Sequence, residues 1–438
     1  MILDARLWAR NCWMRSANRG NGNNVTYVNS SGNCNNNNAS SALRAAPDRA
    51  WIRAKGLREA MVTQDSICTR SLHPRGMAPE QSEGDGPCDL RDVCPITAED
   101  VIGFDALWES MLKSRKGVMW KGSVASFCLN GAESIARLST ELRDGTYRPG
   151  RNTCFTVTSP KPRDVVAQTF RDRVYHRSIV DNLVYPLMSP SWIYDNAACQ
   201  RGKGTDFARD RYRKHLRDQY LHGGTEAYVL SVDVRGYYKN IPHDRAEALF
   251  DGRLPEWGQD MVVGALRAHY PGDVGYNPGS DIVQMVGVSY LSDLDHHVKE
   301  RLHVRGYLRY MDDLRLINGD ERYLERCLRV ITDELGMIGL EPHPKKTTIR
   351  PVTKADTFLG FDFRMLGSGK VIMTLTGANV KAMRRRVGRL HKLEVDGLRP
   401  PGTTDTAYAG WRAHAEKGDS KELLARCDEW YAHLAHGR

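Results

Sequence analysis

The sequence predicts an α+β fold in which short buried strands are preceded and followed by amphipathic helices. Residues 227–232 (AYVLSV) are rich in apolar and β-branched side chains and predict a buried strand. Near residue 310, the run GYLRYMDDLRLI places strand-forming side chains on both sides of two adjacent aspartates. Residues 104–117 and 123–145 carry apolar side chains at helical spacing.

Further elements are expected along the chain. The segment TYRPG, which follows Gly145, has the character of a strand. Beyond glycines at 367 and 369, residues 371–375 predict one strand of a hairpin, and residues 379–393 predict a helix. Two more helices, around 408–411 and over 423–434, complete a small helical region.

The adjacent aspartates Asp312 and Asp313 are the most informative residues of the chain. Two neighbouring carboxylates repel each other, and aspartate is a poor strand former. Their cost is tolerated if the pair lies at a tight β-hairpin and faces a divalent cation, because Mg²⁺ takes carboxylate oxygens as ligands. A solvated turn is the commoner explanation of an isolated aspartate pair.

A third carboxylate, Asp233, makes the metal hypothesis stronger. It follows the predicted strand directly, and the chain then runs through Tyr237 and Tyr238 to a helix start at residues 242–244, where Asp244 is the expected N-cap. Carboxylates at the ends of two strands can hold the two cations, about 4 Å apart, of a phosphoryl-transfer site. The alternative is that Asp233 merely ends a strand.

The order of these blocks resembles a reverse transcriptase of the bacterial retroelement type, over residues from about Phe104 to the C-terminus. The segments that carry the resemblance are 158–183 and 199–216 (fingers), 229–244 (motif A), 278–302 (motif B), 309–316 (motif C), 335–347 (motif D) and 358–363 (motif E). The resemblance implies a right-hand polymerase with fingers (99–225), a palm made of an antiparallel sheet packed on helices (226–365), and a small helical thumb (366–438).

The resemblance also implies the activity and its requirements. The chain would be an RNA-directed DNA polymerase that uses an RNA template, a primer and dNTPs, with an accessory protein or a cognate noncoding RNA as a further partner. Two Mg²⁺ ions, which Mn²⁺ could replace, would be held by a group of four residues: Asp233, Val234, Asp312 and Asp313.

Several cations and one aromatic residue are candidates for binding the nucleotide. Lys161 and Arg163 follow a strand and suit a triphosphate. Arg201 and Lys203 lie among glycines that allow a close approach of the backbone to a phosphate. A solvated basic loop is the alternative for both pairs. In the family, the aromatic residue at the position of Tyr238 packs under the nucleotide sugar and excludes a 2′-OH; the alternative is an ordinary core tyrosine.

Motif B departs from the family pattern. Gly279 and Gln284 are kept, but Val283 replaces the usual serine. Gly279 would let the backbone pass beneath the template base, and Gln284 would hydrogen-bond in the groove or hold the turn. Gln rather than Pro at this position resembles the enzymes of diversity-generating retroelements more than those of introns or retroviruses.

Basic residues in two later segments are candidates for contacts with the template–primer duplex. Motif D supplies Lys345 and Lys346. The predicted helix 379–393 carries a run of cations that includes Arg384, Arg385 and Arg389. The alternative for this helix is a solvated basic surface.

Composition agrees with a nucleic-acid enzyme. The 438 residues carry a formal net charge of +10, and the sequence pI is about 9.1, which suits a groove that neutralises phosphates. The sequence contains no run of 18 apolar residues, so no membrane span is expected. Arginines at positions 6, 10 and 15 interrupt the apolar core that a signal peptide would need. None of the ten cysteines forms a CxxC pair, so reduced thiols in a bacterial cytoplasm are expected.

The first 50 residues are rich in asparagine, with a run at 35–38. They predict either a disordered polar tail or a translated template repeat, because asparagine codons begin with two adenines and the diversity-generating family copies its template with errors at adenines. Residues 51–98 are polar and proline-containing and predict a linker.

Two functional classes stay open. The first is an active polymerase, most simply one that serves a diversity-generating retroelement. The second is a reverse-transcriptase fold used for RNA binding or in phage defence, in which polymerisation is secondary or independent of a template. Relatives in phage defence share all these motifs, so the motifs alone do not separate the biological roles.

Overall fold

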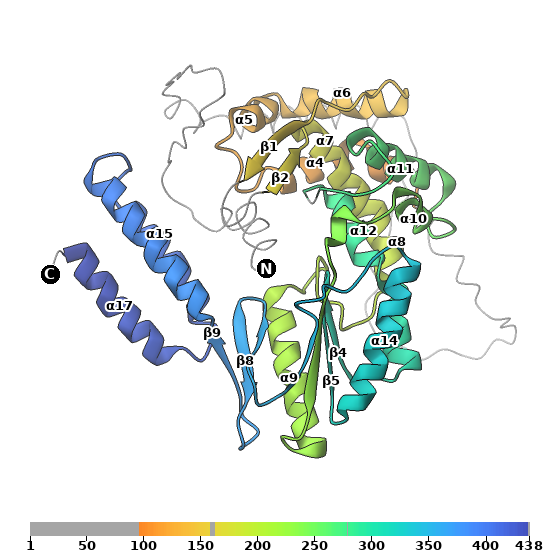
Figure 1. Ribbon diagram of the computed structural model, residues 1–438. Coiled ribbons are helices and arrows are strands. Elements are labelled where there is room, and N and C mark those ends of the chain that lie inside the picture. Colours follow the sequence, from red (N-terminus) through yellow and green to blue (C-terminus); the bar gives the residue numbers. More distant parts are fainter. Residues whose placement is uncertain (1–95, 158–162, 278, 437–438) are drawn as a thin grey trace, which may run out of the picture. The chain divides into compact units, whose positions relative to one another are not determined.

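The computed structural model describes residues 96–157, 163–277 and 279–436 (Figure 1). Within them the chain divides into two compact units. The helical unit comprises residues 96–150 and 169–183. The sheet unit comprises the described residues of 151–168 and 184–436. The asparagine-rich segment 1–50 and residues 51–95 of the linker predicted over 51–98 lie outside the described residues.

The helical unit is built from five α-helices and the start of a π-helix. They are α3 (Glu99–Ile102), α4 (Phe104–Ser114), α5 (Gly122–Leu129), α6 (Gly131–Arg143), α7 (Phe170–Ile179) and η4 (Val180–Val184). The two helical patterns predicted between residues 104 and 145 are thus confirmed, the second of them as two helices. Leu107 of α4 and Ile135 of α6 are completely buried, so the apolar stripes of these helices form the core of this unit.

The strand expected at TYRPG was wrong. Residues 146–150 have no regular secondary structure. Instead, the Tyr147 hydroxyl donates to Asp172 Oδ1 at 2.7 Å and the Gly150 amide donates to Asp172 Oδ2 at 3.0 Å. Pro149 has no backbone N–H to offer a neighbouring strand, and the segment is held by a buried carboxylate of α7 instead.

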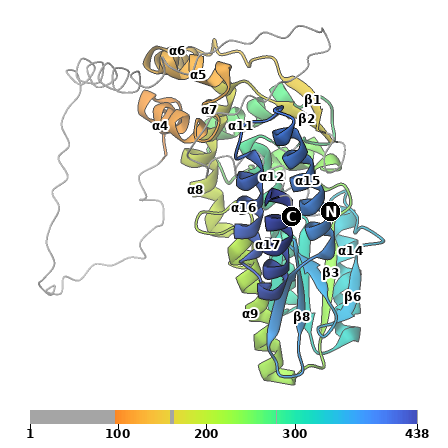
Figure 2. The same ribbon diagram turned by 90° about the vertical axis from the view of Figure 1, so that its left-hand side faces the viewer.

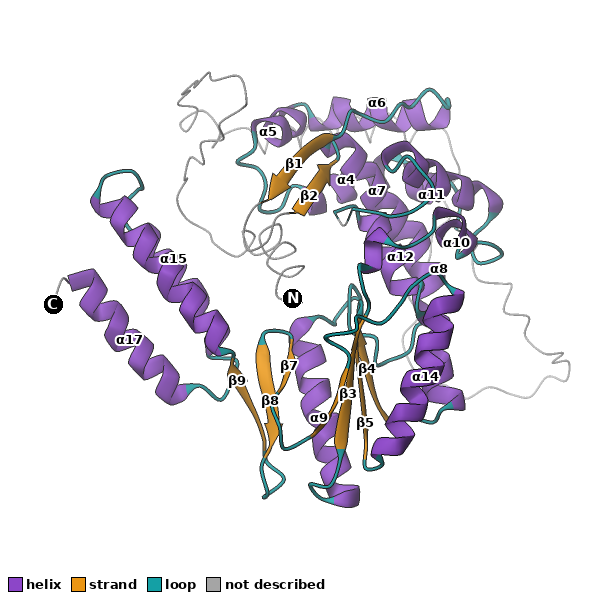
Figure 3. Ribbon diagram, in the orientation of Figure 1, coloured by secondary structure: helices purple, strands orange, loops and turns teal. Residues whose placement is uncertain are grey.

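A four-stranded antiparallel sheet forms the centre of the sheet unit. Its strand order is β4 (Gly306–Tyr310), β5 (Asp313–Asn318), β3 (Tyr228–Asp233) and β6 (Thr348–Pro351). In Figure 3 this sheet lies between α9 (Thr205–Gly223) and α14 (Glu321–Met337). Both sheet faces are therefore covered, and Val229, Leu308 and Leu316 are almost fully buried.

Two smaller antiparallel sheets accompany the central one. A hairpin pairs β1 (Thr153–Val157) with β2 (Arg163–Ala167). The other sheet is formed by β7 (Asp356–Phe358), β8 (Phe361–Met365) and β9 (Val371–Leu375), which confirms the hairpin strand predicted at 371–375. Tyr212 of α9 packs against the rings of Phe358 and Phe363, so one core joins this sheet to the central one.

Helices fill the connections and the C-terminal part. They are α8 (Tyr185–Met188), η5 (Ser189–Ser191), η6 (Tyr237–Lys239), α10 (His243–Ala248), α11 (Glu256–His269), α12 (Asp281–Ser289), α13 (Ser292–His296), η7 (His297–Arg301), α15 (Gly377–Val395), α16 (Thr403–Ala415) and α17 (Lys421–His436). The last three pack side by side around Met383, Val387 and Tyr408 (Figure 2), as the sequence predicted for this region.

The N-cap expected at Asp244 was wrong. Helix α10 begins at His243, two residues earlier than an N-cap at Asp244 requires; its N-cap is Pro242, and no side chain caps it. Asp244 lies in the first turn, where its carboxylate accepts from the amide of Arg245 at 2.8 Å.

The structure is a mixed helix-and-sheet fold whose sheets are antiparallel; its description as fingers, palm and thumb stays a prediction. No helix in the described part of the chain is long and apolar enough to cross a membrane.

Candidate active site

The aspartate pair lies at the tight hairpin that the sequence predicted. Tyr310 and Asp313 are paired across β4 and β5, so Met311 and Asp312 alone form the turn. Met311 has a φ of +57°, a left-handed conformation that costs a non-glycine residue on the order of 1 kcal/mol. Such a conformation persists only where the surrounding contacts hold it.

Asp233 lies directly opposite Asp313 on the neighbouring strand. Directly opposed residues of an antiparallel pair have their Cβ atoms about 5 Å apart. One residue further along, the amide of Val234 donates to the carbonyl oxygen of Asp312 at 3.1 Å. Strand pairing therefore brings the three predicted carboxylates to one end of the sheet.

Cations of the protein balance two of these carboxylates. Asp313 is almost completely buried and accepts a hydrogen bond from the guanidinium of Arg315, which also donates to Asp356 at 2.7 Å. Asp233 is 6 % exposed, and its Oδ1 accepts from the ammonium of Lys346 at 2.7 Å. Both strand-end carboxylates thus have a positive partner within the fold.

The three aspartates are of the residue type that binds magnesium, but their side chains are not arranged as the ligands of a metal ion. Carboxylate oxygens are the ligands that Mg²⁺ prefers, and the Lys346 ammonium marks a position beside Asp233 where a positive charge is stabilised. Across the described residues, however, no three His, Cys, Asp or Glu side chains converge closely enough to hold a metal ion. The residues fit the predicted ions by type and by place in the sheet, and metal binding would require their side chains to reorient.

The segment after α14 explains why Lys346 reaches Asp233. The amide of His343 donates to the Asp233 carbonyl at 2.7 Å, and the amide of Arg235 donates to the carbonyl of Glu341 at 2.9 Å. The segment that follows α14 is thus tied by its backbone to the end of β3. Lys345, predicted with Lys346 to contact the template–primer duplex, is exposed on this segment.

Tyr238 lies against both the hairpin turn and α12. Its hydroxyl donates to Met311 Sδ at 3.5 Å. Its ring fills the space where Gly287 of α12 has no side chain: a Cβ built on Gly287 would stand 2.4 Å from the Tyr238 oxygen. Burial raises the pKa of the Tyr238 hydroxyl well above its usual value, so the group is a neutral donor.

Arg309 is a functional candidate that the sequence analysis missed. Its guanidinium is completely buried and makes two hydrogen bonds, of 2.7 and 2.6 Å, to Asp295. It also donates to the carbonyls of Val288 at 2.7 Å and Met311 at 3.0 Å. Burial by itself lowers the pKa of Arg309, but Asp295 outweighs it and the net shift is upward. A cation in the middle of an apolar strand, three residues before the aspartates, was the signal available in the sequence.

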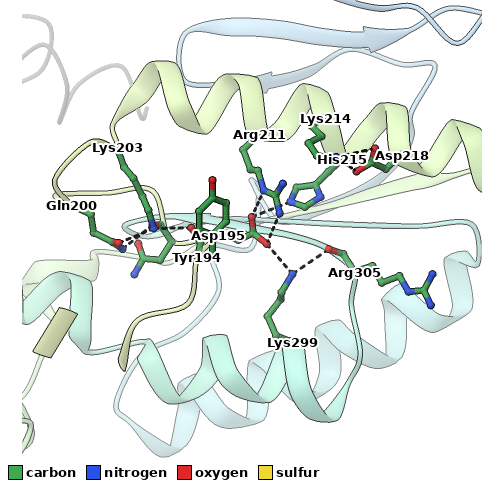
Figure 4. A network of polar contacts seen from close by, with 11 residues as sticks. Tyr194, Asp195, Gln200, Lys203, Arg211, Lys214, His215, Asp218, Lys299 and Arg305 are labelled. Atoms are coloured by element: carbon green, nitrogen blue, oxygen red, sulfur yellow. Dashed lines mark hydrogen bonds and ion pairs between the residues drawn. The ribbon is translucent and has the colours of Figure 1, made fainter. Parts of the chain in front are cut away.

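A buried carboxylate, Asp195, holds the loop before α9 against α9 itself and against η7 (Figure 4). It accepts from Arg211, from His215 at 3.3 Å and from Lys299 at 2.9 Å. Burial raises the pKa of Asp195, but hydrogen bonds from these three residues outweigh burial and leave it well below its usual value. The Asp195 carbonyl also accepts from the amide of Arg309 at 3.1 Å, so this loop is joined to β4.

The two cations predicted in this loop differ in their surroundings. The Lys203 ammonium donates to the carbonyls of Tyr194 and Asn196, at 2.8 and 3.1 Å, and to Gln200 Oε1 at 2.8 Å. A lysine has three donors, so this geometry favours a role in shaping the loop over the predicted triphosphate contact. Arg201 is exposed and its guanidinium stacks on the ring of Tyr185 at 4.5 Å.

Gln284 is held by a strained cysteine. The Cys199 thiol donates to Gln284 Oε1 at 3.4 Å, and Cys199 has a φ of +51°. Burial, followed by the nearby Asp281 carboxylate, raises the pKa of the Cys199 thiol to about 12, which keeps it protonated as a donor. Cys199 does not stand out in the sequence, because a lone cysteine without a partner motif carries no signal.

The remaining predicted residues lie at several places. Lys161 is outside the described residues, Arg163 is the first residue of β2, and Gly279 lies in the turn before α12. The basic residues of α15 are on its exposed side, since Met383 and Val387 face α16 and α17. Exposed on this helix are Lys381, Arg384, Arg385, Arg386, Arg389 and Lys392.

No protein-family model matches the chain, and no curated protein matches it. Among solved structures, the chain is similar to the apo telomerase of Candida tropicalis, truncated from its C-terminal domain, with 12 % identity and a TM-score of 0.38 over 51 % of this chain and 54 % of that one. It is also similar to the telomerase of Candida albicans in complex with the TWJ fragment of telomeric RNA, with 8 % identity and a TM-score of 0.38 over 56 % and 50 %. The chain spans about half the length of both structures.

Proposed function

We propose that this protein is an RNA-directed DNA polymerase that makes cDNA from an RNA template by two-metal nucleotidyl transfer. The observation that carries the proposal is the pairing of Asp233 with Asp313 on adjacent strands, with Asp312 in the adjoining turn. Three carboxylates at one end of a sheet are costly unless they meet cations, and phosphoryl transfer is a chemistry that needs such a site.

The four predicted ligands would act through their oxygens. Asp233, Asp312, Asp313 and the main-chain carbonyl of Val234 would hold two Mg²⁺ or Mn²⁺ ions, which supply activation of the primer hydroxyl and stabilisation of the leaving pyrophosphate. Lys346 is partly exposed, with 24 % of its side chain accessible, so its ammonium can leave Asp233 when another cation arrives.

The exposed face of α15 supports a nucleic-acid partner. Its cations are not offset by acidic neighbours until Glu394, near the end of the helix. Arginines and lysines at this density neutralise phosphates and release counterions. We assign the template–primer duplex to this face, and the incoming dNTP to the region of Tyr238 and Gln284. Service in a diversity-generating retroelement is the biological role that Gln284 favours.

The test is primer extension by Asp312→Asn. Asparagine keeps the size of the side chain but removes the charge that a divalent ion needs. Incorporation of dNTPs on a primed RNA template with Mg²⁺ should fall by at least about a hundredfold, while binding of template–primer stays within about threefold. The control is Asp293→Asn, since Asp293 is 97 % exposed and should retain the wild-type rate.

Substantial extension by Asp312→Asn would remove the metal role of the aspartate pair. Equal losses in Asp312→Asn and Asp293→Asn would instead point to a general loss of folding, which circular dichroism of both variants distinguishes.

A second candidate function is RNA binding without templated synthesis. The observation in its favour is that Arg315 and Lys346 already neutralise two of the three carboxylates. A protein of this kind would bind RNA equally well with Mg²⁺ and with EDTA and would incorporate no nucleotide under either condition. Extension that depends on Mg²⁺ separates the first candidate from this one.

A further inference from the structure

The ring of Tyr238 occupies a space that exists only because residue 287 is glycine. A Cβ on Gly287 would stand 2.4 Å from the hydroxyl oxygen of Tyr238, 2.7 Å from Cζ and 2.8 Å from Cε1. Ordinary contacts between such atoms are about 3.5 Å or longer. One added methyl group therefore requires the outer end of the ring to move by about 1 Å.

The helix beneath the ring cannot give way easily. Carbonyls in the last turn of a helix lack partners within the helix, and side chains from two other elements hold those of α12. The Tyr237 hydroxyl donates to the Gly287 carbonyl at 2.7 Å, and Arg309 donates to the Val288 carbonyl at 2.7 Å. We therefore expect the Tyr238 ring, rather than α12, to move when a methyl group is added at Gly287.

The displacement would reach the turn that carries Asp312. The Tyr238 hydroxyl donates to Met311 Sδ at 3.5 Å, and the Met311 carbonyl accepts from the Arg309 guanidinium at 3.0 Å. The contacts thus form a closed circuit that runs through Arg309, Met311, Tyr238 and the end of α12. The residues of this circuit come from segments far apart in sequence. Adding one methyl group at Gly287 would disturb it by displacing Tyr238.

We infer that Gly287 is a specificity-determining position, which sets the selection between deoxyribonucleotides and ribonucleotides by giving Tyr238 its place. The inference rests on the proposed function and on Tyr238 as the residue under the nucleotide sugar. Alanine is a better helix former than glycine, so helix stability alone does not favour glycine at this position. Gly287 acts through Tyr238 and is a positioning residue.

The experiment compares Gly287→Ala with Gly264→Ala. Gly264 lies in α11, is exposed, and a Cβ there would meet no atom within 4 Å. Both substitutions replace a helical glycine by alanine, so they differ in the clash with Tyr238. Efficiencies kcat/KM for single dNTPs and rNTPs are measured on a primed RNA template with Mg²⁺. A displacement of about 1 Å in a positioned group costs up to about a hundredfold.

For Gly287→Ala we expect the dNTP efficiency to fall about tenfold or more and the rNTP/dNTP ratio to change at least about fivefold. Gly264→Ala should match the wild type within about twofold. The decisive arm is Tyr238→Ala, which should admit rNTPs and leave room for the methyl group. In that background, adding Gly287→Ala should change neither value by more than about twofold.

The inference would be overturned if Gly287→Ala and Gly264→Ala had the same efficiencies and the same rNTP/dNTP ratio. It would also be overturned if Gly287→Ala changed these values equally with and without the Tyr238 ring. Insolubility of both the single variant Gly287→Ala and the double variant Tyr238→Ala/Gly287→Ala is the third contradicting result. If Gly287→Ala alone is insoluble and the double variant recovers solubility, the clash is supported. A wild type that incorporates neither nucleotide refutes the proposed function itself, and the inference with it. An active wild type with an indifferent Gly287→Ala refutes only the inference.

Discussion

At the scale of single residues, Arg309 shows how a buried charge can position a reactive turn. Its guanidinium is completely buried, as is its partner Asp295, and the Tyr307 hydroxyl donates to the same carboxylate at 2.6 Å. A buried ion pair adds little net stability, but removing one member strands the other. The same guanidinium holds the Met311 carbonyl, so the pair supports the left-handed turn.

We predict that Arg309→Met destabilises the protein by about 3 kcal/mol, because Asp295 would stay buried with only a tyrosine donor. Urea denaturation followed by circular dichroism measures the change. The matched control is Arg326→Met on α14, whose pair with Asp320 is more than half exposed and should contribute no more than about 1 kcal/mol. A loss for Arg309→Met as small as that of the control would show that water reaches Asp295.

Some site residues could be identified from their neighbours in the sequence, and others could be identified only from contacts with residues distant in the sequence. Asp233, Asp312 and Asp313 violate the local preferences of a strand, so each is visible from its immediate neighbours. Gly287 and Cys199 follow no local rule; their roles depend on Tyr238 and Gln284, which are distant in sequence. Only the packing of the fold discloses such residues.

At the scale of elements, the helix α15 separates a packing face from a basic face. Met383 and Val387 are buried against its neighbours, whereas Arg385 and Arg389 are exposed. Arg384 is also exposed but stacks on Trp430 at 5.4 Å. Arg385 and Arg389 are therefore the better probes of nucleic-acid binding, because replacing Arg384 would also remove its contact with Trp430.

We predict that Arg385→Gln/Arg389→Gln weakens binding of a template–primer duplex at low salt and lowers the slope of log K against log [salt] by about 1 to 2. Fluorescence anisotropy across a salt series measures both quantities. Arg322→Gln/Arg326→Gln on α14, which removes the same charge from exposed positions, is the control. An equal change of slope in both pairs would mean that the whole surface charge, rather than α15, binds the duplex.

Elements could be predicted where periodicity and turn chemistry agree. The strands β3, β4, β5 and β9 and the helices α15 and α17 lie at the predicted places. TYRPG failed as a strand because its tyrosine and glycine bond to a carboxylate of α7, a contact that strand propensity does not include. Asp244 failed as an N-cap because Pro242 already supplies an extended lead-in with φ −65° and ψ 138°.

At the scale of the whole molecule, all candidate site residues lie at residue 161 or beyond. We predict that removal of residues 1–50 changes primer extension by less than about tenfold, equivalent to about 1.4 kcal/mol at the barrier. Soluble yield and extension rate of the shortened and full-length proteins are compared. Aggregation of the shortened protein, or a larger loss, would contradict the interpretation of this segment as a translated template repeat.

The order of strands in the central sheet has a consequence for biosynthesis. β3 is made first, but both of its neighbours, β5 and β6, come later. About 80 residues separate Asp233 from Asp313, which at about 5–20 residues per second is a wait on the order of 4–16 s. Through that interval the strand YVLSVD has two open edges and no sheet partner. During this interval the nascent chain is vulnerable to pairing with other chains at a strand that later lies inside the sheet, and slower translation prolongs the exposure.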